Sequence, residues 1–138
     1  MAKAYFERDQ VAVEDFFALI PEGQKADLID GVIYIASPDS RRNDQLGGLI
    51  RFLVQGFTAT RGFGKTFGSR FAFELSKTDA PEPDIPFVSK ARLHLVEETR
   101  MKGAPDIAVE IVARESRTVT TSKRRTSMRL QACLSTGS

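Results

Sequence analysis

The sequence predicts an α+β fold in which a mixed sheet is flanked by helices. Three observations support this prediction: a hairpin signal in the first third of the chain, a long helical pattern after it, and several short apolar runs that follow. The chain has 138 residues, enough for one domain with a substantial core, and we find neither an internal repeat nor an interdomain linker. We therefore expect one domain over residues 1–118, followed by a tail of different character at 119–138.

The first half of the chain predicts two helices with a hairpin between them. Residues 13–20 have the spacing of a short amphipathic helix, which a Pro-Glu-Gly step ends. Residues 26–36 contain two apolar runs joined by Asp-Gly, a dipeptide typical of hairpin turns. The longest helix is predicted from residue 43 to about residue 60, where apolar side chains recur at spacings of three and four. We predict that this apolar stripe faces the core.

Short strands dominate the second half. Strand-like runs occupy residues 70–75, 83–88 and 104–113. The last run is the most hydrophobic, so we place it at the centre of the sheet. Residues 89–103 are mostly polar and predict a connection with one helical turn.

Two Pro-Asp steps, Pro83-Asp84 and Pro105-Asp106, each open an apolar run. The second run places a lone carboxylate, Glu110, inside a strand that we expect to be buried, and such a group is costly unless it is paired or binds a metal. Two acids on neighbouring strands, Asp84 and Glu110, are what a divalent-metal site requires. We interpret Asp106 differently, as a turn-forming residue at the start of its strand.

Charge and composition narrow the class of protein. The net charge is +2, yet residues 1–118 hold 16 basic and 18 acidic side chains, so the basic character comes from the tail. The single Cys133 excludes an internal disulfide and a cysteine-built zinc site, and the single His94 excludes a multi-histidine metal site. Because the chain has neither a membrane-length apolar stretch nor an apolar signal core, we expect a cytoplasmic protein without a membrane partner.

The order and spacing of several segments resemble the Uma-two family of restriction endonucleases, within the PD-(D/E)XK nuclease superfamily. No single segment decides the match, but together they cover residues 11–117. The matching segments are VEDFFAL at 13–19, DLIDGVI at 27–33, SP at 37–38, EPDI at 82–85, FV at 87–88 and GAPDIAVEIV at 103–112.

The resemblance implies a restriction-endonuclease-like core and a metal-dependent hydrolase that cleaves DNA phosphodiester bonds. It makes Asp84 the metal-binding aspartate and Glu110 the second acid, which together ligate Mg²⁺ (or Mn²⁺), and it makes Asp27 a third acid that assists. The metal would lower the pKa of a water and stabilise the charge that builds on phosphorus. DNA is then the partner, and a homodimer is an open alternative because double-strand cutting by this fold often needs two active sites.

The chain departs from the family pattern in three places. Val112 occupies the position where the simple motif has lysine, and the family supplies that lysine from the following helix instead. Asp27 replaces the usual glutamate at the start of the hairpin and is one methylene shorter. Asn43 stands where a histidine often precedes the long helix.

The tail at 119–138 lacks the aspartate, lysine, tyrosine and Glu-Tyr-Trp strand that the family has at this point. Permitted codons for these residues, read two nucleotides later, can encode all of those features in order. Codons selected to favour that outcome establish compatibility only. We predict a frameshift near residues 118–119, which leaves residues 1–118 as a C-terminally incomplete nuclease domain and the tail as a non-native basic segment.

The predicted loss of the family's lysine leaves several functions open. Lys123 lies near the right place in sequence and is the candidate replacement, although its neighbours do not set it on an amphipathic helix. The first hypothesis is an Mg²⁺-dependent endonuclease, impaired by the lost helix and strand. The alternatives are a catalytically inactive remnant that binds nucleic acid weakly through its basic tail, and a protein-interaction module formed by newly exposed apolar surface.

Overall fold

The computed structural model describes residues 10–112 and 131–132. A helix, a hairpin, a long helix and then short strands follow one another as the sequence predicts, and the mixed α+β class is confirmed. The elements are α1 (Val13–Leu19), β1 (Ala26–Ile29), β2 (Val32–Ile35), α2 (Arg41–Thr60), β3 (Gly64–Thr66), β4 (Ala72–Glu74), β5 (Ile85–Ser89), the 3₁₀ helix η1 (Lys90–Leu95), β6 (Arg100–Lys102), β7 (Ile107–Val109) and β8 (Gln131–Ala132). The sequence analysis did not predict β6, a three-residue strand within the polar connection, or β8 in the tail, and it expected a loop or a short strand at residues 62–68, where β3 lies.

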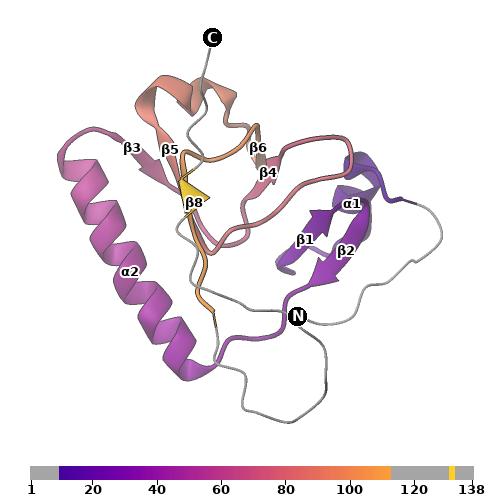
Figure 1. Cartoon of the computed structure of the whole chain (residues 1–138), viewed down its shortest axis with the longest axis horizontal. Coiled ribbons are helices and arrows are strands. Elements are labelled where there is room, and N and C mark those ends of the chain that lie inside the picture. Colours follow the sequence, from indigo (N-terminus) through magenta and orange to yellow (C-terminus); the bar gives the residue numbers. More distant parts are fainter. Residues whose placement is uncertain (1–9, 113–130, 133–138) are drawn as a thin grey trace.

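The described strands form three small sheets. The largest has the order β3-β5-β7-β8 and is antiparallel throughout. The other two are the β1-β2 hairpin and a parallel β4-β6 pair. Strand β7 lies between β5 and β8, which confirms the interior position predicted for the run at 104–113. Figure 1 shows α2 on one side of this sheet and the hairpin with α1 on the other side.

The hairpin turn follows from its Asp-Gly sequence. Asp30 and Gly31 both have positive φ, 48° and 70°, which is the backbone of a type I′ turn. A Cβ on Gly31 would lie 2.6 Å from the Cβ of Gln10, so glycine is required here. In the register that this turn sets, Leu28 faces Ile33, and both side chains are buried.

Two apolar clusters hold the elements in place. The first packs α1 on the hairpin and contains Val13, Phe16, Ala26, Leu28, Ile33 and Ala80. The second joins β4, β5 and β6 through Phe73, Val88 and Met101. Reciprocal backbone hydrogen bonds between Leu28 and Ala80, 3.2 and 2.8 Å long, fix β1 beside the segment that leads into β5. The hairpin is thereby brought next to Asp84, which directly precedes β5.

Helix α2 begins at Arg41, two residues earlier than predicted, after the Ser40 side chain accepts a hydrogen bond from the Asn43 N–H at 3.2 Å. The predicted burial of its apolar stripe is wrong for most members. The exposed ones, 43 to 58% accessible, are Leu46, Leu49, Leu53 and Phe57. Helix α2 contacts β3, and Thr58 is the one buried residue of this helix. Helical spacing predicts an apolar side of a helix but not that another element covers it.

Most of the tail lies outside the described residues, and so does Lys123. The exception is residues 131–132, which form β8 and pair antiparallel with β7. Neither the proposed frameshift nor the role of Lys123 is tested by these two residues, and both stay predictions. Within the described part of the chain, no helix is long and apolar enough to cross a membrane.

Candidate active site

Asp84 is held by three separate elements. One carboxylate oxygen, Oδ1, forms an ion pair with Nζ of Lys25, the residue before β1. The other, Oδ2, accepts a 2.8 Å hydrogen bond from the N–H of Ile111. Its backbone carbonyl accepts a 2.6 Å hydrogen bond from the Nη2 of Arg51 on α2. The position and orientation of this carboxylate are therefore fixed by the hairpin, by the segment after β7 and by the long helix.

Glu110 lies directly after β7 rather than inside a strand, and the residue is exposed, so its predicted burial is wrong. It nevertheless meets Asp84, for a reason found in the strand register. Ile85 pairs with Val109 in the antiparallel β5-β7 ladder. One step further along this register, Asp84 stands opposite Glu110.

The two carboxylates repel each other. Protein around the Glu110 carboxyl limits its hydration although the residue as a whole is exposed, and the neighbouring Asp84 charge adds to this effect. Together they raise the pKa of Glu110 to about 8, and the attraction of Lys25 offsets part of the rise. Such a pair is stabilised by a shared proton or by a cation between the acids.

Asp27 and Glu82 form a second acidic pair behind the first. Asp27 Oδ1 accepts a 2.7 Å hydrogen bond from the Glu82 N–H, and Glu82 Oε2 accepts one of 3.2 Å from the Ala26 N–H. Burial raises the pKa of Asp27, and burial raises that of Glu82 to about 7. Asp27 also acts electrostatically on Glu110. The structure thus gathers the three predicted acids that it describes.

Sequence reasoning missed Lys25 and Glu82. A signal for Lys25 was present, because residues 25 and 27 project to the same face of a strand, opposite the buried Ala26. Glu82 sits between two prolines, and nothing in that pattern distinguishes a buried acid from an exposed one. Both residues acquire their roles when the hairpin docks beside residues 80–84.

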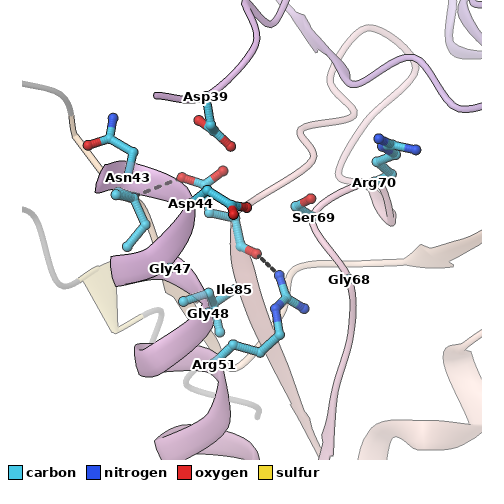
Figure 2. A pocket seen from close by; sticks show the side chains of 12 residues that line it. Asp39, Asn43, Asp44, Gly47, Gly48, Arg51, Gly68, Ser69, Arg70 and Ile85 are labelled. Atoms are coloured by element: carbon cyan, nitrogen blue, oxygen red, sulfur yellow. Dashed lines mark hydrogen bonds between the residues drawn. The ribbon is translucent and has the colours of Figure 1, made fainter. Parts of the chain in front are cut away.

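A pocket of about 460 Å³ opens beside Asp84, between the first half of α2 and the loop at 68–70. Figure 2 shows Asp39 and Asp44 near one end, with Arg51 and Arg70 projecting from different walls. On the α2 side the pocket is lined by glycines without side chains, and a Cβ on Gly48 would meet nothing within 4 Å, so the space beside it is open. The lining residues are Asp39, Asn43, Asp44, Gly47, Gly48, Arg51, Gly68, Ser69, Arg70, Asp84, Ile85 and Ile111.

Asp84 and Glu110 are the residues that could hold a hard divalent cation, because their carboxylate oxygens are the ligands that Mg²⁺ and Mn²⁺ prefer. The described residues include no group of three or more His, Cys, Asp or Glu side chains placed to hold a metal. Two carboxylates fit Mg²⁺ nevertheless, since this ion keeps several waters in its shell. Their mutual repulsion, which adds to the effect of burial in raising the pKa of Glu110, is what a bound cation relieves.

A solved structure has the same fold. It is described as "a putative nuclease belonging to DUF820" from Anabaena variabilis and matches with a TM-score of 0.62 at 14% identity. The match covers 78% of this chain and 62% of that one, so this chain spans less than two thirds of its length. At this identity the likeness shows the fold alone, and the predicted restriction-endonuclease-like core is confirmed. No curated protein matches the chain.

The sequence identifies the family. The model of the Uma2 family, described as "Putative restriction endonuclease", matches residues 13–131. The match extends over most of the chain, which therefore belongs to the Uma2 family. The resemblance deduced from the sequence segments is confirmed. The matched range ends within residues 119–138, and the origin of that tail stays a prediction.

Proposed function

We propose that this chain is a metal-dependent DNA endonuclease domain that hydrolyses phosphodiester bonds with Mg²⁺ or Mn²⁺. The observation that supports it best is the opposed carboxylate pair, Asp84 and Glu110, at the joined ends of β5 and β7. One member of the pair, Asp84, lines a pocket, and the chain belongs to a family described as "Putative restriction endonuclease". In this proposal the partner of the domain is DNA, and no membrane is involved.

The residues of the chain have distinct parts in this proposal. Asp84 and Glu110 are the metal ligands, and a divalent cation bound there would activate water and offset charge on the scissile phosphate. The Ile111 N–H and Arg51 keep Asp84 oriented through bonds of 2.8 and 2.6 Å. Asp27 contributes negative charge close to the pair. The repulsion between the two carboxylates favours cation binding, because the pair without a cation is less stable than the pair with one.

The pocket beside Asp84 is the proposed place for the DNA strand. Its volume of about 460 Å³ accommodates part of a nucleotide chain. The guanidinium groups of Arg51 and Arg70 line it, and guanidinium is a good partner for phosphate. Arg51 already donates to the carbonyls of Phe67 and Asp84, so Arg70 is the better phosphate contact.

A second candidate is a catalytically inactive remnant that binds nucleic acid weakly. The observation that favours it is Val112, exposed and apolar, at the position where the motif has a lysine. Lys123, the predicted replacement, lies outside the described residues. The two candidates differ in one measurable property, the cleavage of DNA.

The test is nicking of supercoiled plasmid by the purified chain with Mg²⁺ or Mn²⁺. We expect nicked product that EDTA abolishes and that Glu110→Ala reduces by about 10³-fold, because half of the carboxylate pair is lost. Glu98→Ala is the matched control, since Glu98 is exposed and lies three residues after the end of η1, outside the proposed site. Cleavage that persists in Glu110→Ala would come from another site or a contaminant and would overturn the proposal. A folded chain with no cleavage would support the inactive remnant.

A further inference from the structure

We propose that Lys25 is a catalytic residue of this domain, whose ammonium group contacts the phosphate that is cleaved. The proposal rests on the nuclease function above and adds to it the group that neutralises charge beside the metal ligands. It differs from the sequence-based candidate, Lys123, which lies outside the described residues.

Lys25 is held in place by its local structure. It precedes β1, where Ala26 is buried in the core and donates its N–H to Glu82 at 3.2 Å. Strand alternation turns Lys25 to the same face as Asp27, toward the acids. Its side chain is only 21% exposed and its Nζ reaches Asp84 Oδ1. A lysine on a free surface keeps its ammonium in water, whereas the ammonium of Lys25 pairs with a carboxylate of the site.

The charges around Lys25 exceed what one ammonium can balance. Besides its ion pair with Asp84, its attraction acts on the carboxyl groups of Asp27, Glu82 and Glu110. The four acids carry more formal negative charge than Lys25 and Arg70, which also acts on Glu82, can balance, so a further cation beside Lys25 is electrostatically favoured. Lys25 therefore need not leave the site when Asp84 and Glu110 take up a metal.

The other described cations near the site have other roles: Arg51 is bound to the backbone, and Arg70 lines the pocket as the proposed contact for a DNA phosphate. Arg51 donates to the carbonyls of Phe67 and Asp84 at 2.7 and 2.6 Å, which commits its guanidinium to the backbone. Arg70 acts on Glu82. In the described part of the chain, Lys25 is the cation paired with the Asp84 carboxylate.

The chemistry of phosphodiester hydrolysis gives this ammonium a function. A bond forms between phosphorus and the oxygen of the attacking water, and the bond to the leaving sugar oxygen breaks. The water gives its proton to solvent and the leaving oxygen takes one from solvent. Negative charge grows on the other phosphate oxygens meanwhile, and a preorganised ammonium beside them stabilises it. Lys25 keeps its own protons throughout.

The experiment compares Lys25→Met and Lys25→Arg with Lys102→Met. Lys102 is a matched control, because it also pairs with a carboxylate, Glu97 at 3.7 Å, but is 60% exposed. Three quantities are measured in each variant of the 138-residue chain: the plasmid nicking rate with Mn²⁺, Mn²⁺ affinity by electron paramagnetic resonance, and the unfolding midpoint by circular dichroism.

We expect Lys25→Met to slow nicking by about 100-fold, the effect of removing one group that stabilises transition-state charge. Mn²⁺ should bind this variant as tightly as the wild type or about fivefold tighter, because a competing positive charge has left Asp84. Lys25→Arg keeps the charge and should restore nicking to within about tenfold of the wild type. Lys102→Met should behave like the wild type in all three measurements.

The contrary results are equally distinct. If both the wild type and Lys25→Met nick plasmid at the same rate, the role of Lys25 is overturned and the nuclease function is left standing. Loss of Mn²⁺ affinity together with nicking means that Lys25 only holds Asp84 in place, which also overturns it. A wild type that binds Mn²⁺ but does not nick overturns the nuclease function itself. Should Lys25→Met fail to fold, folded Lys25→Arg decides: nicking near the wild-type rate supports the proposal, and loss of Mn²⁺ binding contradicts it.

Discussion

The two Pro-Asp steps have the same local structure and opposite surroundings. Asp84 directly precedes β5 and Asp106 directly precedes β7. The carboxylate of Asp84 meets Lys25 and stands opposite another acid, Glu110. That of Asp106 accepts a 2.7 Å hydrogen bond from the Ser89 N–H and pairs with Arg92 at 3.1 Å.

The two aspartates differ in the charges of the groups that surround them. Asp106 has only favourable partners: burial opposes its charge, but the Ser89 N–H and Arg92 outweigh this and lower its pKa. Asp84 shares its surroundings with acids, and burial together with the Asp84 charge raises the pKa of Glu110 to about 8. The aspartate of one Pro-Asp step thus stabilises the fold, and the aspartate of the other belongs to a cluster of acids that repel one another. Strain of this kind is typical of active sites, which sacrifice stability for function.

The largest expected effect separates the two aspartates by activity. Asp84→Asn removes a charge from the proposed metal pair and should lower plasmid nicking by about 10³-fold. Asp106→Asn should leave nicking within about twofold, because Asp106 belongs to no part of the proposed site. Parallel rate measurements on both folded variants test this. Equal losses in the two would mean that the comparison between the steps does not hold.

The second effect concerns the free energy of unfolding. Here the residue that matters is Asp106, whose substitution is not expected to change nicking. Asp106→Asn should lower the free energy of unfolding by about 1 to 2 kcal/mol at pH 7, because two charge-assisted contacts are weakened. The folded pKa of Asp106 lies below its unfolded value, so this contribution is present above that value, about 3.9, and is lost as the pH falls through the folded pKa. Urea unfolding at a series of pH values measures it. A difference between wild type and variant that grows in acid would refute this account.

The smallest effect is a gain. Glu110→Gln removes the repulsion with Asp84 and should stabilise the metal-free protein by roughly 0.5 kcal/mol, a small value because water screens an exposed residue. The unfolding midpoint in EDTA measures it, with Glu98→Gln as the control for loss of an exposed glutamate. A midpoint that falls in Glu110→Gln alone would argue that the carboxylate pair is not strained.

Local sequence signals predicted the elements well and the site in part. The Asp30-Gly31 turn and the strand starts at Asp84 and Asp106 depend on backbone preferences of a few residues, and these the sequence displays directly. The burial of Glu110 was mispredicted because the apolar run around it continues after β7 has ended. The short strand β6 escaped notice because three residues cannot display an alternating pattern.

The features that could not be predicted from the sequence depend on contacts between residues far apart in the chain. Lys25 reaches Asp84 because the hairpin docks beside residues 80–84, through contacts such as the Leu28–Ala80 hydrogen bonds. No local pattern encodes that docking. The stripe of α2 illustrates the same limit, since its spacing predicted the helix correctly and its burial wrongly.

The apolar side chains exposed on α2 also decide how these variants can be studied. Dyes such as ANS fluoresce on apolar surface, and their binding usually marks a loosened, molten state. Here the folded protein already presents such a surface, with Phe52 73% accessible, so a dye will be bright before any unfolding begins. Dye-based melting curves would start from a high signal and understate every difference between variants. The helical signal of the 20-residue α2 is the better reporter of the folded state.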